Sequence, residues 1–169
     1  GVFYKQLIHD FKIFISYFKE DVVLILKTWG KDLVLIMITT IIIQIITHTT
    51  QANNQIALQN SFNSNPVFIA ILAMFYAPIA EELMFRGVFR KFIKNKKLFV
   101  IVSGVVFGLM HVIDDSKTLA EFSYVFVYSI LGIYLAGIYA KTNNLCTNIF
   151  MHFMQNTLSV IGMILLMFM

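Results

Sequence analysis

The sequence predicts an all-α fold, a polytopic membrane helix bundle, and composition is the first reason. Of its 169 residues, 59% are hydrophobic and only 13% are charged, a balance outside the usual range of soluble domains. The mean hydropathy of +0.79 agrees with this. Several apolar stretches also approach the ~20 residues that a helix needs to cross a bilayer. We expect about five transmembrane helices and no sizeable soluble domain.

The first segment, residues 3–26, has apolar side chains at every third or fourth position and charged residues between them. This spacing predicts an amphipathic helix. Such a helix could lie in the membrane interface or pack against the helical core, and the pattern fits both arrangements. We therefore divide the chain into an N-terminal amphipathic or interfacial helix, residues 1–28, and a membrane-embedded core, residues 29–169.

The core contains five predicted spans separated by short polar connections. The spans are residues 29–47, 66–80 with the acidic pair that follows, 98–112, 122–140 and 145–169. Trp29, Lys31 and Asp32 would stand at the start of the first span. Residues 49–65 are uncharged and rich in Asn and Gln, which predicts an outer loop. In the fourth span, Gly132 and Gly137 would let a neighbouring helix approach closely.

Basic residues cluster in the connection between the second and third spans. They are Arg86, Arg90, Lys91, Lys94, Lys96 and Lys97. By the positive-inside rule the 90–97 loop faces the cytoplasm, and the Asn-rich segment and the C-terminus lie outside. The bias toward Ile, Lys, Asn and Phe is typical of a low-GC bacterium, so we expect a multi-pass protein of the bacterial plasma membrane. The lipid bilayer is then its surroundings, and the net charge of +4 does not indicate a nucleic-acid partner.

Three of the spans carry polar groups that are costly in a membrane. They are Glu81, Glu82, Arg86, His111, His152 and Asn156. A charged side chain at mid-bilayer costs at least ~2.5 kcal/mol, so such groups indicate a functional site. The structural alternatives are an ion pair at a helix end, an interfacial histidine and polar contacts between packed helices.

The spacing places these groups at one depth. Glu81 lies 15 residues before Lys96 and His111 lies 15 residues after it, so a hairpin turning near Lys96 brings them level. His152 follows the turn at Asn143 by nine residues, which gives a comparable depth. Neighbouring positions diverge by about 100° around a helix, so Glu81 and Glu82 should have different roles.

We interpret the set as a site that activates water. Glu81 would act as general base on a water held with His111. Glu82 would pair with Arg86. His152 and Asn156 would donate hydrogen bonds to the oxyanion of an attacked peptide carbonyl.

The alternative is that a bound metal ion, rather than side chains alone, activates the water. Glu81, His111 and His152 could hold a zinc ion with an open position for water. The spacing is not that of the His-Glu-x-x-His motif. We favour the arrangement without metal, and zinc remains the cofactor of the alternative.

Three motifs, Glu81-Glu82-xxx-Arg86, Phe107-xxx-His111 and His152-xxx-Asn156, resemble in order and spacing those of the CAAX protease and bacteriocin-processing family of intramembrane proteases, the Abi family. Their flanks, Ala77-Pro78-Ile79-Ala80, Phe85-Arg86-Gly87 and Leu131-Gly132 through Asn143, resemble that family's core too. The resemblance covers residues 67–158.

It implies a membrane endopeptidase similar to the type II CAAX prenyl endopeptidases, either glutamate-dependent or a metalloendopeptidase. The first Glu and first His would activate water, and the last His and Asn would form the oxyanion hole.

Two classes of function follow. In the first, the protein hydrolyses a peptide bond of a membrane-associated protein or peptide. Peptide processing or bacteriocin immunity is the expected theme, because prenylated CAAX proteins are not expected in a low-GC bacterium. The alternative is a non-catalytic immunity or scaffold protein that binds a peptide or a partner in the same polar cavity. Because all six motif residues are present, we favour the enzyme.

Overall fold

The computed structural model describes residues 3–114 and 116–168. Within them every regular element is a helix, which confirms the predicted all-α class. Four helices of this described part are long and apolar enough to cross a membrane: Phe18–Thr47, Pro66–Phe92, Leu119–Thr142 and Leu145–Met167. Four positions lie outside the described residues: residues 1–2, Asp115 and Met169. The first two belong to the predicted N-terminal helix and the last to the predicted fifth span.

The amphipathic segment is divided between two helices, α1 (Tyr4–Ser16) and α2 (Phe18–Thr47). Tyr17 leaves helical geometry between them, with φ −115° and ψ 28°. The first span therefore begins at Phe18 rather than at Trp29. Asp32, expected at the start of a span, instead lies in the middle of α2 and is fully buried.

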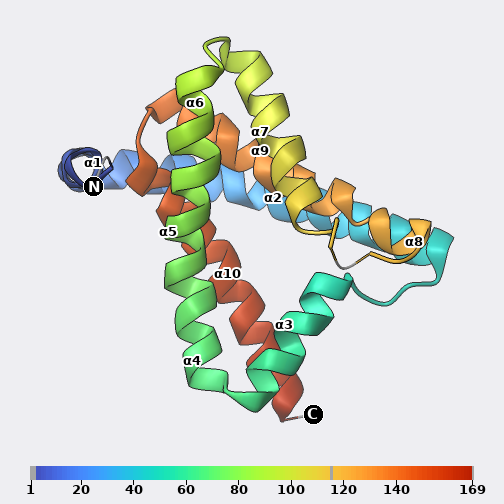
Figure 1. Cartoon of the computed structure of the whole chain (residues 1–169). Coiled ribbons are helices and arrows are strands. Elements are labelled where there is room, and N and C mark those ends of the chain that lie inside the picture. Colours follow the sequence, from blue (N-terminus) through green and yellow to red (C-terminus); the bar gives the residue numbers. More distant parts are fainter. Residues whose placement is uncertain (1–2, 115, 169) are drawn as a thin grey trace.

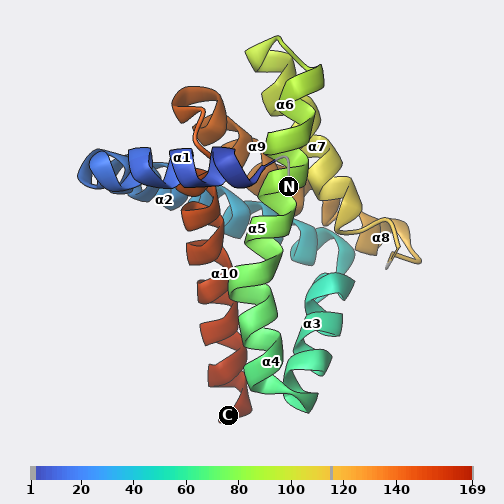
Figure 2. The same ribbon diagram turned by 60° about the vertical axis from the view of Figure 1, so that its left-hand side comes forward.

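Helix α1 packs against the start of α10 (Leu145–Met167), as in one of the two arrangements that its pattern allowed. The buried Asp10 accepts a hydrogen bond from the backbone N–H of Leu145 at 2.9 Å, and its carbonyl accepts one from the Asn144 amide at 2.9 Å. Asn144 in turn caps α10 by accepting from the N–H groups of Cys146 and Thr147. Figure 2 shows α1 lying across α10. The N-terminal helix thus anchors the helix that carries His152.

The Asn-rich segment predicted to be a loop contains a helix, α3 (Asn53–Ser64), so that prediction was wrong. Two apolar residues four positions apart explain the helix. Phe62 is buried and Leu58 is partly buried in a cluster with Val160 and Met163 of α10. A narrow apolar stripe at this spacing is enough to dock a helix whose other faces are polar.

A continuous helix of 27 residues, Pro66–Phe92, carries the acidic pair. Its segments are α4 (Pro66–Ile71), the π-helical η1 (Leu72–Tyr76), α5 (Ala77–Glu82), the π-helical η2 (Leu83–Val88) and α6 (Phe89–Phe92). Pro66 occupies the first turn, where its missing N–H costs nothing. Figure 1 shows this helix beside α10, with α2 crossing both at a steep angle.

The remaining helices are α7 (Lys96–Met110), α8 (Leu119–Phe122) and α9 (Val125–Thr142). The third span was predicted at α7, which has 15 residues. At ~1.5 Å per residue it is about 22 Å long, shorter than the ~30 Å hydrocarbon core. This difference explains why the described residues contain four candidate spans instead of about five.

Helices α7 and α9 pack with their backbones in contact at glycine. A Cβ atom on Gly104 would lie 2.7 Å from the backbone nitrogen of Ile133, and one on Gly132 would lie 2.7 Å from the carbonyl oxygen of Gly104. The predicted role of Gly132 is confirmed. A Cβ on Gly137 would meet no other described part of the chain within 4 Å, so the predicted role of Gly137 was wrong.

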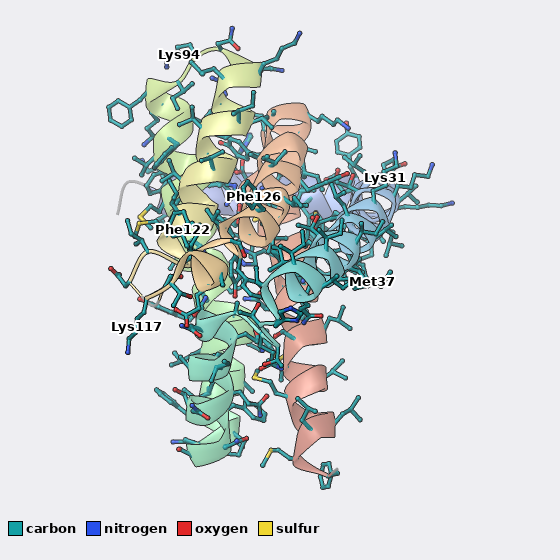
Figure 3. The ribbon with its side chains drawn as sticks, turned by 90° about the vertical axis from the view of Figure 1, so that its right-hand side faces the viewer. Lys31, Met37, Lys94, Lys117, Phe122 and Phe126 are labelled. Carbon is teal, nitrogen blue, oxygen red and sulfur yellow. The ribbon has the colours of Figure 1, made fainter. Side chains whose placement is uncertain are left out.

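The basic connection and the C-terminal end of α10 lie at opposite ends of the molecule, as the labelled Lys94 shows in Figure 3. Helix α3 lies at the same end of the molecule as the C-terminal turns of α10 (Figure 1). This separation agrees with the expected topology, in which the 90–97 loop and the Asn-rich segment face opposite sides of the membrane. The cytoplasmic side remains a prediction from the positive-inside rule.

The glycine contact predicts unequal effects of two substitutions on α9. Gly132→Ala should lower the free energy of unfolding by roughly 1–3 kcal/mol, because backbone atoms of α7 cannot move aside easily. Gly137→Ala should leave stability unchanged or raise it by up to about 1 kcal/mol, because alanine favours a helix. Thermal unfolding in one detergent measures both. Equal stability of the two variants would contradict the close packing.

Candidate active site

The long helix Pro66–Phe92 brings three of the predicted site residues to the centre of the bundle. Glu81 and Glu82 end α5, and Arg86 lies in η2. π-helical turns widen a helix locally and occur often at functional sites. The carbonyls of Ala73 in η1 and Phe85 in η2 both accept side-chain hydrogen bonds, from Asn156 and Ser103. The irregular turns are therefore held by neighbouring helices.

Glu82 and Arg86 form the predicted ion pair, and both side chains are 0% exposed. The distance from Arg86 Nη1 to Glu82 Oε1 is 3.0 Å. Asn148 of α10 donates to Glu82 Oε2 at 3.0 Å, and His152 Nδ1 lies 2.9 Å from Oε1. Both oxygens of this carboxylate thus have partners, as a buried charge requires.

Arg86 is held from three other sides. Its Nη2 donates to the carbonyl of Gly132 on α9 at 2.8 Å. The rings of Phe85 and Phe107 lie 5.8 and 5.1 Å from the guanidinium carbon, within the range of cation–π attraction. The long helix is thereby joined to α9 through a charged, fully buried contact.

Glu81 faces two imidazoles. Its Oε2 lies 3.8 Å from His111 Nε2 and 3.7 Å from His152 Nε2. That oxygen is buried and has no hydrogen-bond partner among the described residues. The structure therefore brings Glu81, His111 and His152 together at one point, as expected from their common depth.

The opposite nitrogen of each imidazole fixes its orientation. His111 Nδ1 lies 2.8 Å from the carbonyl oxygen of Phe107. A carbonyl only accepts, so Nδ1 carries the hydrogen and a neutral His111 presents a lone pair at Nε2. The ring also stacks on that of Tyr128 at a centroid distance of 4.8 Å and lies at a tilt against that of Phe107 at 4.3 Å. The same reasoning assigns a hydrogen to His152 Nδ1, which faces the carboxylate of Glu82.

Asn156 lines the same cavity, yet one of its hydrogen bonds goes elsewhere. Its Nδ2 donates to the carbonyl of Ala73 at 2.8 Å. An amide nitrogen has two N–H groups. The bond to Ala73 therefore orients the second N–H while leaving it available to a ligand.

These side chains border a cavity of about 240 Å³ between α3, the long helix, α7, α9 and α10. We call it the reaction cavity. Glu81, His111, His152 and Asn156 all line it, whereas Glu82 and Arg86 do not. The six predicted residues thus divide into four that reach the cavity and two that support it from behind.

In this structure the donor atoms of the described residues are not arranged as a metal site. Among residues 3–114 and 116–168, no group of three or more His, Cys, Asp or Glu side chains is arranged to hold one. Although Glu81, His111 and His152 converge, their separations of 3.7 and 3.8 Å exceed the roughly 3.3 Å between two ligands of a tetrahedral zinc ion. We therefore derive no chemical step through a metal.

Asn148 is a site residue that sequence reasoning missed. It bonds to Glu82 and also donates to the carbonyl of Leu135 on α9 at 2.7 Å. The signal was present, because positions 148, 152 and 156 are four apart and share one helix face. A second omission, the hydrogen bond from Trp29 Nε1 to Gln155 Oε1 at 2.8 Å, joins residues 126 positions apart.

Several relatives share part of the sequence. The chain is 29% identical over 114 residues to the Bacillus subtilis (strain 168) protein named "Putative membrane peptidase YdiL", covering 66% of this chain and 43% of that protein. It is 26% identical over 127 residues to the Lactococcus lactis subsp. lactis (strain IL1403) "UPF0177 protein YvdC", covering 74% and 46%.

The chain is also 34% identical over 76 residues to "UPF0177 protein YxdF" of the same Lactococcus strain, covering 44% and 38%. The chain thus spans less than half the length of these relatives. No solved structure matches it.

Residues 63–158 match the family described as type II CAAX prenyl endopeptidase Rce1-like. The matched region begins in α3 and ends in α10, so it contains all six predicted site residues. The resemblance expected from the three motifs is confirmed. Since the match covers more than half of the 169 residues, the chain belongs to the Rce1-like type II CAAX prenyl endopeptidase family, a family of proteases.

Proposed function

We propose that the protein is an intramembrane endopeptidase that hydrolyses a peptide bond with a water activated by Glu81 and His111. The single observation that carries this proposal is the environment of Glu81 Oε2, which is buried, has no partner among the described residues, and faces two imidazole nitrogens within 4 Å. Family membership supports peptide hydrolysis as the reaction.

The activation step follows from hydrogen-bond capacity. Glu81 Oε2 and a neutral His111 Nε2 are both acceptors 3.8 Å apart, so a water molecule that lies to one side of the line joining them can donate to both. Such a water directs both hydrogens to the acceptors and a lone pair to the substrate. As its oxygen bonds to the carbonyl carbon, one proton passes to Glu81, which later delivers it to the leaving nitrogen when the C–N bond breaks.

The oxyanion would be stabilised from α10. Asn156 contributes its second N–H, oriented by the bond to Ala73. His152 carries a hydrogen on Nδ1 toward Glu82, so it donates from Nε2 only as an imidazolium. In this role Glu82 and Asn148 position His152 and do not touch the substrate.

The substrate would be a membrane-associated protein or peptide. The reaction cavity lies within a bundle of membrane-spanning helices, and the setting we propose is a bacterial plasma membrane with the 90–97 loop in the cytoplasm. Peptide processing, including processing connected with bacteriocin immunity, is the function class that fits this placement.

Replacing Glu81 with Gln should abolish cleavage while the protein stays folded. The amide keeps the shape of the side chain but cannot take a proton from water, and loss of a catalytic acid–base group typically costs 10²–10⁴-fold in rate. Small peptides from cells that carry either form at equal membrane abundance can be compared by mass spectrometry.

Glu20→Gln is the matched control, because Glu20 is exposed on α2. Cleavage products should disappear with Glu81→Gln and persist with Glu20→Gln. If the Glu81 variant produces the same peptides as the wild type, its assignment as general base is wrong. If a protective phenotype also persists, binding without cleavage explains the protein better.

Replacing Glu82 with Gln should act first on stability. Arg86 would remain buried without a counter-ion, and breaking a buried pair in this way costs about 3–5 kcal/mol. Thermal unfolding of Glu81→Gln and Glu82→Gln in one detergent compares two adjacent, isosteric changes. We expect a large drop in Tm for Glu82→Gln only, and equal Tm values would refute the division of roles.

Chelation should leave cleavage unchanged. In the proposed reaction, side chains alone hold and activate the water, so turnover of purified protein should persist in metal-free buffer with a chelator. The assay compares rates before stripping, after stripping and after zinc is added back. Loss of activity followed by recovery with zinc would replace this mechanism with metal-assisted hydrolysis.

A further inference from the structure

A second cavity, of about 220 Å³, adjoins the reaction cavity between α2, the start of α3 and α9. The two cavities share Gln55, Tyr128, Leu131 and Gln155 in their walls. The two cavities are therefore neighbours, with these four side chains at their boundary.

The wall of the second cavity carries uncharged polar side chains among apolar ones. It contains the side chains of Thr40, Gln44, Thr50 and Gln51, together with the two glutamines shared with the reaction cavity. Among the described residues, no Asp, Glu, Lys or Arg lines it. Amides and hydroxyls of this kind can pair with either N–H or C=O groups.

An extended peptide needs such a lining inside a membrane bundle. Each backbone N–H or C=O that loses water without gaining a hydrogen bond costs several kcal/mol in a hydrocarbon setting. A lipid chain has no such requirement, and an apolar wall would suit it better. The hydrogen-bonding side chains in this mixed wall thus favour a peptide over a lipid chain as its occupant.

Gln155 stands where the cavities meet, and its amide has a defined orientation. The indole N–H of Trp29 is only a donor, so the atom 2.8 Å away must be the carbonyl oxygen of Gln155. The amide nitrogen then lies on the other side with two N–H groups, and it has no partner among the described residues. It is three residues after His152 on the same helix, so it can donate to a substrate carbonyl near the scissile bond.

We infer that the second cavity is a substrate subsite, which takes an uncharged segment of the peptide on one side of the scissile bond and holds its backbone through Gln155 and the neighbouring amides. This inference rests on the proposed function and adds to it a rule of specificity. A charged substrate residue in this subsite would lose its hydration without finding an opposite charge.

A change of specificity tests the subsite more sharply than a loss of activity. Gln51 is exposed and lines the second cavity but not the reaction cavity. Gln51→Glu is isosteric and introduces one negative charge. Gln59→Glu is the matched control, because Gln59 lies on α3 and lines neither cavity.

The assay uses the full chain in lipid nanodiscs and a mixture of synthetic peptides that are randomised over a short central segment. Sequencing of the products by mass spectrometry gives the residue preference at each position around the cut. Wild type should disfavour Asp, Glu, Lys and Arg at neighbouring positions on one side. Gln51→Glu should enrich Lys and Arg there by about twofold to fivefold, the factor expected of an exposed charge pair, while Gln59→Glu keeps the wild-type profile.

A deeper substitution provides a second test. Thr40→Asp introduces the charge from α2 and should also favour Lys and Arg, whereas Thr39→Asp, on a residue that lines neither cavity, should not. If wild type cleaves the peptides and both cavity variants keep its profile, the subsite is wrong and the proposed function stands. If wild type leaves every peptide intact, the proposed function fails and the subsite fails with it.

Discussion

The buried ion pair between Glu82 and Arg86 is the interaction on which the site depends. Both side chains are 0% exposed, and their neighbours come from α9 and α10. Burying two charges is costly, and only complete pairing offsets that cost. The consequence is geometric, because any shift of the long helix relative to α9 or α10 would break a charged contact. Glu81 and His152 are therefore held in register by groups that never reach the cavity.

Close packing at glycine makes this network possible. Where α7 and α9 touch through Gly104 and Gly132, no side chain separates their backbones. The carbonyl of Gly132 can then accept from Arg86, and His111 at the end of α7 is brought level with Glu81. In membranes, small residues allow such approach and van der Waals contact supplies the attraction. One glycine contact thus serves both helix packing and placement of the groups that we propose to be catalytic.

The elements predictable from sequence were those governed by local periodicity. Equal spacing around Lys96 placed Glu81 level with His111, and a separation of four paired Glu82 with Arg86. Features that depend on tertiary contacts were not predictable in this way. Helix α3 forms because Phe62 finds a buried position, and Trp29 meets Gln155 across 126 residues. Asn148 is an intermediate case. Its position on the same helix face as His152 was predictable from the spacing, but its hydrogen bond to Glu82 depends on how the long helix packs against α10.

The most direct test of this account is a double-mutant cycle on the ion pair, read by both stability and peptide cleavage. Replacing Glu82 and Arg86 together by Met removes both charges, so the double variant should be more stable than either single variant, with a coupling energy of roughly 0.5–3 kcal/mol. It should still fail to cleave, because His152 has lost the carboxylate that orients it. Additive losses in stability, or a double variant that cleaves at the wild-type rate, would contradict the central role of this pair.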